Sequence, residues 1–253
     1  MFGRKVETPE FLETPTHVEA LNRLLYLVES GTTMALIQGQ TGSGRTVVLA
    51  KLKQILTRQQ FSCPMVNVAG MDAETLFWHI ASVFSLPAAS QQNKAATLIS
   101  IRDEILGRAH CGLKTLLILD DLDHGFGDFQ GAIRYLAAVA AQTEGMFSIV
   151  MAASTLPTGG LIDDAELRVE LPRLSRAESA AFAMKMLGAL TENGQSLTQN
   201  ALEEITSLAQ GLPARLTQLC NVLHVVHETT PDLAIDEHIV RELALEVGLR
   251  SAA

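Results

Sequence analysis

Short apolar runs alternate with longer amphipathic stretches through the first two thirds of the chain. The short runs predict buried strands, and the stretches between them, with apolar residues at helical spacing, predict helices. We expect strands at residues 34–38, 65–68, 115–119, 148–152 and 167–171. We expect helices at residues 17–30, 47 to about 60, 72–84, 94–108 and 129–142. Strands that alternate with helices indicate an α/β fold in which a five-stranded parallel sheet is covered on both faces.

The pattern changes after the fifth predicted strand. Ser175 and Glu178 have the spacing of a capping box, and only helical patterns follow, with breaks at Gly194, Gly211 and Pro231. We therefore expect two domains, an α/β core at residues 1–173 and a helical domain at residues 174–253. An earlier box of the same kind, Thr16 to Glu19, predicts the start of the first helix.

A glycine-rich loop joins the first predicted strand to the helix after it. Its residues are Gly39, Gln40, Thr41, Gly42, Ser43, Gly44, Arg45 and Thr46. They fit the phosphate-binding pattern G-x-x-x-x-G-K-[ST] at every defined position but one, and the strand and helix provide the context that the motif needs. Glycines let the backbone turn its N–H groups toward phosphates, and the helix N-terminus adds partial positive charge. We expect these eight residues to bind a nucleoside triphosphate.

Arg45 is the departure, because it stands where the motif has lysine. The guanidinium keeps the positive charge, but it is longer, planar and fork-shaped, so the exchange is not conservative. We expect nucleotide binding to survive this exchange better than catalysis does. Thr46 is expected to place its hydroxyl on Mg²⁺.

Two carboxylates follow the third predicted strand, which reads Leu-Leu-Ile-Leu at residues 116–119. We expect Asp120 to hold Mg²⁺ and Asp121 to orient the attacking water. Glutamate is common at the second position, so the shorter Asp121 is expected to place the water less well. Asp123 fits better as a carboxylate that caps the next helix.

Further positions complete the candidate site. Ser154 or Thr155, at the end of the fourth strand, is a candidate to hydrogen-bond the nucleophilic water, and strand-end turn chemistry explains these residues equally well. Arg215 follows the break at Gly211 and is a candidate to reach the phosphates from the helical domain. His17, at the start of the first helix, is a candidate to cover the adenine, although helix capping explains it as well.

Charge and composition narrow the function classes. The formal net charge of −9 argues against general affinity for nucleic acid. Residues 1–60 nevertheless carry seven Lys or Arg against five Asp or Glu. A local basic face with Lys51, Lys53 and Arg58 stays open, although a solvated helix face explains these residues better. No apolar run reaches the roughly 20 residues of a membrane span. The three isolated cysteines are typical of buried, reduced thiols, and we expect a cytoplasmic protein.

With these residues in place, the chain resembles AAA+ ATPases. It is most similar to the ExeA/GspA-type ATPases of the general secretion pathway and to their TniB-like transposition relatives. The matching stretches are residues 14–26 (TPTHVEALNRLLY), 39–46, 116–121 (LLILDD), 169–175 (VELPRLS) and 211–220 (GLPARLTQLC). The first stretch and the phosphate-binding loop are the most specific.

The resemblance implies a five-stranded core with a C-terminal helical lid, ATP and Mg²⁺ as ligands, and assembly of a homo-oligomeric ring or filament in which a neighbour supplies an arginine. Four features depart from the family pattern. Arg45 and Asp121 replace lysine and glutamate, and residues 156–166 hold no arginine, which leaves Arg134 and Arg168 as candidates for the neighbour's contact. The membrane span of many secretion members is missing, although a membrane-associated partner stays open.

Three functions therefore remain open from the sequence. The first is a slow ATPase whose nucleotide state controls oligomeric assembly and a partner protein. The second is a catalytically weak nucleotide-binding adaptor, a pseudo-ATPase or a STAND-like protein, which the pair Arg45 and Asp121 favours. The third is a DNA-binding assembly factor of the transposition type, which the acidic balance disfavours.

Overall fold

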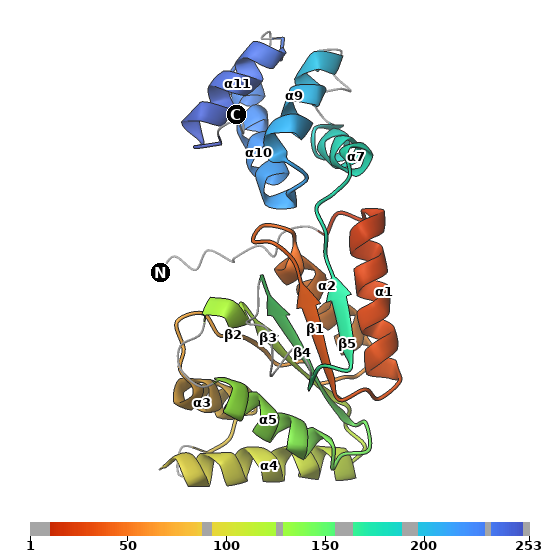
Figure 1. Ribbon diagram of the computed structural model, residues 1–253, viewed down its shortest axis with the longest axis vertical. Helices are drawn as coiled ribbons and strands as arrows, with labels where there is room; N and C mark the ends of the chain where they lie inside the picture. The colour runs from red at the N-terminus through yellow and green to blue at the C-terminus, as the bar shows by residue number, and fades with distance from the viewer. Residues whose placement is uncertain are drawn as a thin grey trace. The chain divides into compact units, whose positions relative to one another are not determined.

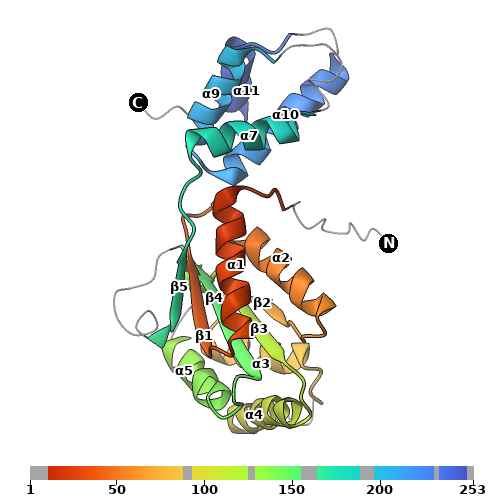
Figure 2. The same ribbon diagram turned by 90° about the vertical axis from the view of Figure 1, so that its right-hand side faces the viewer.

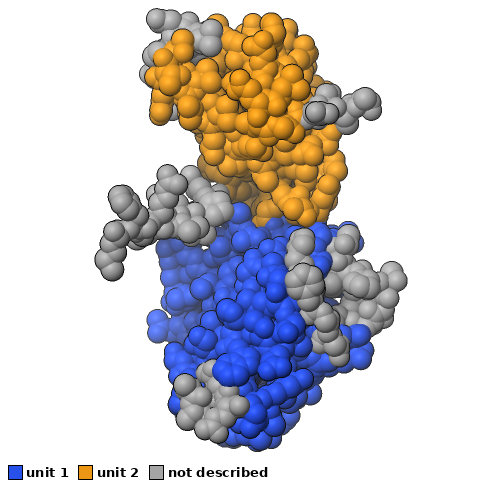
Figure 3. Space-filling model, turned by 90° about the vertical axis from the view of Figure 1, so that its left-hand side faces the viewer, with its two compact units in different colours: residues 1–11, 19–39, 45–171 blue, residues 12–18, 40–44, 172–253 orange. Residues whose placement is uncertain are grey.

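The computed structural model describes most of the chain. The described residues are 11–87, 93–124, 129–154, 164–188, 197–230 and 234–249. They fall into two compact units, which Figure 3 colours separately. The sheet unit comprises residues 1–11, 19–39 and 45–171, and the helical unit comprises residues 12–18, 40–44 and 172–253. Residues 40–44 of the phosphate-binding loop thus group with the helical residues.

The sheet unit alternates strands and helices along the chain (Figure 1). Its strands are β1 Met34–Gln38, β2 Met65–Asn67, β3 Thr115–Asp120, β4 Phe147–Ala153 and β5 Leu167–Glu170. Its helices are α1 Pro15–Glu29, whose first residues group with the helical unit, α2 Arg45–Arg58, α3 Ala73–Val83, α4 Lys94–His110, the 3-10 turn η2 Leu122–His124 and α5 Phe129–Ala140.

The five strands form one parallel sheet in the order β2-β3-β4-β1-β5. This confirms the predicted fold class. Strand β1, which leads into the phosphate-binding loop, pairs with β4 and β5, so that Leu36 lies opposite Met151 and Arg168. The carboxyl ends of all five strands therefore meet at one edge of the sheet, where ligands bind in open α/β sheets.

Successive residues of each strand supply the two faces of the sheet in turn. In β3, Leu117 and Leu119 join the core under α3, α4 and α5, whereas Leu116 and Ile118 join the core under α1 and α2. Figure 2 shows α1 and α2 together on one side of the sheet. Because both faces are covered, these strands read as continuous apolar runs, which is why they were easy to predict.

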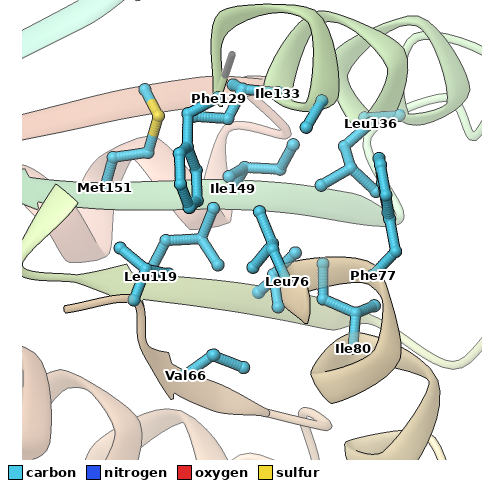
Figure 4. Close-up of a cluster of buried hydrophobic side chains, with 14 of the residues drawn as sticks. Val66, Leu76, Phe77, Ile80, Leu119, Phe129, Ile133, Leu136, Ile149 and Met151 are labelled. Atoms are coloured by element: carbon cyan, nitrogen blue, oxygen red, sulfur yellow. The ribbon is translucent and has the colours of Figure 1, made fainter. Parts of the chain in front are cut away.

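The core under α3, α4 and α5 is closely packed. In Figure 4, Leu119 and Ile149 of the sheet point toward Leu76 of α3 and Leu136 of α5. These four side chains are fully buried. Burial of one leucine contributes about 1.5–3 kcal/mol, so this face is a main source of the unit's stability.

The helical unit is a bundle of short helices around its own core. Its helices are α7 Arg176–Met186, α9 Gln199–Ala209, α10 Pro213–Thr229 and α11 Glu237–Glu246. The predicted capping box at Ser175 and Glu178 is confirmed, with both reciprocal hydrogen bonds present. The predicted break at Gly211 is confirmed as well, because Gln210 and Gly211 have positive φ between α9 and α10. Gly194 and Pro231 lie outside the described residues.

Two local predictions were wrong. Thr16 does not cap the first helix, because α1 begins at Pro15 and the Thr16 hydroxyl donates to Glu178 instead. Thr14 takes the capping position, and its Oγ1 accepts from the His17 N–H at 3.3 Å. Cys111 is exposed rather than buried, whereas Cys63 and Cys220 are buried thiols as expected. Within the part of the chain that the structure describes, no helix is long and apolar enough to cross a membrane.

Leucines 117 and 113 give a matched test of the sheet core, because Leu117 is fully buried and Leu113 is 50% exposed. We expect Leu117→Ala to lower the free energy of unfolding by about 3 kcal/mol, since it leaves a cavity. Leu113→Ala is expected to change it by less than about 0.5 kcal/mol. Urea unfolding followed by the fluorescence of Trp78, the single tryptophan, which lies on α3, measures both. Equal effects of the two substitutions would contradict this account of the core.

Candidate functional site

The end of β3 and the start of α2 meet through a direct hydrogen bond. The Thr46 Oγ1 hydroxyl donates to Asp120 Oδ2 at 2.7 Å, although the two residues are 74 positions apart. Asp120 is buried, which raises the pKa of its carboxyl, while the bond from Thr46 acts in the opposite direction. The two residues expected to share a metal ion are therefore neighbours in space.

Hydroxyl and carboxylate oxygens are ligands that Mg²⁺ prefers. Among the described residues, no group of three or more His, Cys, Asp or Glu side chains is arranged to hold a metal ion. Mg²⁺ is usually held by only one or two protein carboxylates together with substrate phosphates and water. Thr46 and Asp120 thus fit a magnesium ion that arrives with a nucleotide.

Arg45 is buried at the start of α2, with only 5% of its surface exposed. Its Nη2 lies 3.6 Å from Asp121 Oδ1, and its Nη1 lies 3.6 Å from Asp123 Oδ1. At these distances the groups form ion pairs but are too far apart for good hydrogen bonds. Nη1 has no hydrogen-bond partner among the described residues. A buried donor without a partner is costly, so the geometry fits a guanidinium that gains an anionic ligand.

Asp121 is fixed by its backbone and by Asn67. Its φ of +57° is uncommon for a residue other than glycine, although aspartate tolerates it better than most. Asn67 Nδ2 donates to Asp121 Oδ2 at 2.9 Å, while Asn67 Oδ1 accepts from the Ala69 N–H, which orients the amide. Sequence reasoning missed Asn67. The signal was a polar side chain at the end of β2, on the same sheet edge as Asp120.

Asp123 is the second residue that was missed. It was expected to cap a helix, but it accepts from the Ser154 N–H at 2.9 Å and from the Ser154 hydroxyl. Burial favours a higher pKa for this carboxyl, yet the bonds from Ser154 outweigh it and hold the pKa below its ordinary value. Asp123 thus joins Ser154, at the end of β4, to Arg45. Thr155 lies outside the described residues.

The middle of the phosphate-binding loop, residues 40–44, is held by other parts of the helical unit. The Ala214 N–H, at the start of α10, donates to the Gly42 carbonyl at 3.1 Å. Arg173 Nε donates to Gln40 Oε1 at 2.9 Å. Gly42 and Gly44 have φ values of +85° and +99°, a region that only glycine adopts readily.

His17 also contacts this part of the loop. Its Nε2 lies 2.9 Å from the Ser43 carbonyl oxygen, and its Nδ1 lies 2.6 Å from Thr14 Oγ1. The ring is buried, and burial lowers its pKa, so that it is neutral at pH 7. The adenine contact expected of His17 stays a prediction.

The remaining predicted residues lie as follows. The Gly39 N–H donates to the Ala153 carbonyl at 3.3 Å, at the junction of β1 and β4, and Thr41 is exposed. Arg215 Nη1 donates to Gln210 Oε1 at 3.0 Å, so its side chain is tied to the end of α9. Its neighbour Ala214, rather than Arg215, makes the backbone bond to the loop.

Comparison with known proteins places this arrangement in a family. A family model described as an AAA domain matches residues 28–158, more than half of the chain. The chain belongs to this AAA domain family, and the loop at residues 39–46 is therefore part of an AAA-type nucleotide-binding domain. No curated protein matches the chain.

Solved structures share the fold. Cdc6p from Pyrobaculum aerophilum is 16% identical with a TM-score of 0.74, covering 94% of this chain and 69% of that one. Drosophila ORC bound to DNA is 13% identical with a TM-score of 0.66, covering 92% of this chain and 60% of the ORC chain. The Thermotoga maritima RuvB Holliday junction branch migration motor is 14% identical with a TM-score of 0.60, covering 95% and 71%. At these identities the likeness establishes the P-loop AAA+ fold alone.

Asp123→Asn tests the ion pair with Arg45, because asparagine keeps an oxygen for Ser154 and loses the charge. We expect the free energy of unfolding to fall by about 1–3 kcal/mol, since Arg45 stays buried with one carboxylate fewer. The control Asp103→Asn removes an exposed partner of Arg102 and should cost less than about 1 kcal/mol. Urea unfolding measures both. If Asp123→Asn costs no more than the control, the buried pair contributes nothing to stability.

Glu178 gives a pH-dependent test in the helical unit. Burial alone would raise the pKa of its carboxyl, but hydrogen bonds from Thr16 and Ser175 lower it from 4.5 to about 2. A depressed pKa contributes stability above pH 4.5 that is lost as the pH falls toward 2. We expect Glu178→Gln to be less stable than wild type at neutral pH, with the difference shrinking across this window.

Thermal unfolding followed by far-ultraviolet circular dichroism measures this difference in stability. Glu242→Gln is the matched control, because the Glu242 side chain is 67% exposed. A gap between wild type and Glu178→Gln that is constant from pH 7 to pH 2 would rule out the assigned role of Glu178.

Proposed function

We propose that the chain is an ATP-binding AAA+ protein that hydrolyses ATP slowly, and that its nucleotide state controls assembly with copies of itself and with a partner protein. The observation that carries the proposal is the Thr46–Asp120 hydrogen bond beside the buried Arg45. Arg45 Nη1 has no hydrogen-bond partner among the described residues. A phosphate oxygen of bound ATP would supply that partner.

Each site residue has a role in the proposed reaction, an in-line attack of water on the γ-phosphate. Residues 39–46 bind the phosphates, and Thr46 and Asp120 hold Mg²⁺, which neutralises phosphate charge when bound. Asp121 and Ser154 orient the water, and Arg45 stabilises the charge that develops. Arg215 relays the state of the site to the helical residues. Positioning and charge neutralisation supply the catalysis.

The contacts of Arg45 and Asp121 support the slow turnover that we propose. Arg45 lies near two carboxylates, and Asp121 is bonded by Asn67 as well. The phosphate must compete with Asp121 and Asp123 for the guanidinium of Arg45. The aspartate side chain of Asp121 is also shorter than a glutamate side chain, so it reaches less far toward the attacking water. These same contacts favour the second candidate, a nucleotide-binding adaptor in which ATP sets the oligomeric state without useful turnover.

The wider assignments belong to this proposal too. We propose a nucleotide-binding core at residues 1–173, a helical lid at residues 174–253, kinship with ExeA/GspA and TniB proteins, and a cytoplasmic location. A neighbouring copy would supply an arginine, and Arg134, which pairs with Asp164 at 2.9 Å, would have to leave that partner to do so. Drosophila ORC is a structural neighbour bound to DNA, so DNA is included in the test although the net charge of −9 disfavours it.

One experiment separates these functions. ATP binding, ATP turnover and particle mass are measured together with Mg²⁺, with and without duplex DNA, for wild type, Arg45→Lys and Asp121→Glu. We expect wild type to bind ATP and to turn it over more slowly than about 1 s⁻¹. We expect Arg45→Lys to raise the rate by roughly 10-fold, because lysine cannot pair with both carboxylates at once.

Thr46→Ala is the control, because it removes the expected Mg²⁺ ligand and should abolish any turnover. Absence of ATP binding in every form would end the proposal. Binding without turnover in wild type and in both variants selects the adaptor. Turnover that DNA raises, with a steep dependence on salt, selects the DNA-binding function.

A further inference from the structure

The His17 ring is enclosed by two polar contacts that use both of its nitrogens. Nε2 lies 2.9 Å from the Ser43 carbonyl oxygen, and Nδ1 lies 2.6 Å from Thr14 Oγ1. Only 3% of the residue is exposed. A ring this buried, with both nitrogens matched, is held in one orientation.

The partners determine which nitrogen carries the proton. A carbonyl oxygen only accepts hydrogen bonds, so Nε2 must donate to Ser43. Burial lowers the pKa of the ring, which leaves it neutral, and Nδ1 then accepts from the Thr14 hydroxyl. Thr14 Oγ1 accepts in turn from the His17 N–H at 3.3 Å. Each donor in this chain of hydrogen bonds therefore meets an acceptor.

Thr16, the residue before His17, is held by hydrogen bonds to Glu178. Glu178 Oε1 accepts from the Thr16 N–H at 3.0 Å and from the Thr16 hydroxyl at 2.6 Å. Its other oxygen accepts from the Ser175 N–H at the start of α7. The position of the imidazole is thus set by its own two contacts and by the bonds that hold the adjacent residue, Thr16.

Gly44 is shaped to receive the ring. A Cβ atom built on Gly44 would lie 2.5 Å from His17 Nε2, closer than real Cβ atoms approach other atoms. The φ of Gly44 is +99°. Glycine is needed here both for the backbone conformation and for the space that the ring fills.

The consequence for the loop follows from peptide geometry. In a trans peptide the carbonyl and the N–H point in opposite directions, and Ser43 and Gly44 share one such peptide. When His17 holds the Ser43 carbonyl, the Gly44 N–H must point away from the ring. Backbone N–H groups of this loop are the donors that cradle phosphates.

We propose that His17 is a positioning residue of the phosphate-binding loop, whose Nε2–H holds the Ser43 carbonyl so that the Gly44 N–H faces the bound phosphates. This inference rests on the proposed nucleotide binding, and it assigns His17 a role other than covering adenine. It predicts that His17 acts on any polyphosphate, whatever base the ligand carries.

Two substitutions separate the donor from the ring. His17→Gln keeps an N–H donor near the position of Nε2, and His17→Phe keeps a planar ring without the donor. Dissociation constants are measured with Mg²⁺ for ATP and for inorganic tripolyphosphate. We expect His17→Phe to weaken both ligands by about 10-fold or more, because the Ser43 carbonyl loses its donor, and His17→Gln to stay within about 3-fold of wild type.

A loss that appears for ATP but not for tripolyphosphate would overturn the proposal in favour of a contact with adenine. Equal weakening by glutamine and phenylalanine would overturn it in favour of ring shape. Binding by His17→Phe that matches wild type would overturn it outright. If the phenylalanine variant does not fold, Thr14→Val removes the hydroxyl that orients the ring and should weaken both ligands in the same way.

A measurement without ligand keeps this inference separate from the proposed function. Nitrogen-15 NMR of the wild-type ring should show a proton on Nε2 and none on Nδ1. The Gly44 amide resonance should shift in His17→Phe and return in His17→Gln. If wild type binds neither ligand, nucleotide binding fails while these signals still report on His17. The opposite tautomer, or a Gly44 amide that the variants leave unchanged, would overturn the inference.

Discussion

The positive charge of Arg45, buried at the start of α2, is the constraint that the rest of the site must satisfy. A guanidinium cannot lose its proton, so its burial requires counter-charge from the protein or from a ligand. Asp121 and Asp123 supply two carboxylates at 3.6 Å, and Asp123 also binds Ser154. The ends of β3 and β4 and the start of α2 are thereby joined through one cation.

The parallel sheet makes this convergence possible. Parallel strands end at the same edge, so side chains that follow β2, β3 and β4 meet even though they are distant in sequence. Asn67, Asp121 and Ser154 come together in this way. In the helical unit, residues 40–44 are bonded by His17, Arg173 and Ala214, which are also distant from the loop in sequence.

Structural features that depend on a short stretch of sequence were predictable. The strands were found because apolar runs covered on both faces leave a clear signal, and the Ser175 capping box because its reciprocal bonds span three residues. The Thr16 box failed because Glu178, which is remote in sequence, offered the hydroxyl a better acceptor. Asp123 was misread for a similar reason, since its partners Ser154 and Arg45 lie on other elements.

The sequence by itself determined the class of fold and the place of the glycine-rich loop, because each depends on short-range spacing or on hydrophobic periodicity. It also predicted Thr46 and Asp120 as Mg²⁺ ligands, and these two residues are hydrogen-bonded in the structure. Tertiary structure alone decided which side chains hold those residues in place. The tautomer of His17, the pairing of Asn67 with Asp121 and the ion pairs of Arg45 all depend on distances between elements remote in sequence. Spacing along a single chain does not encode such distances; they follow from strand order and from the packing of helices on the sheet.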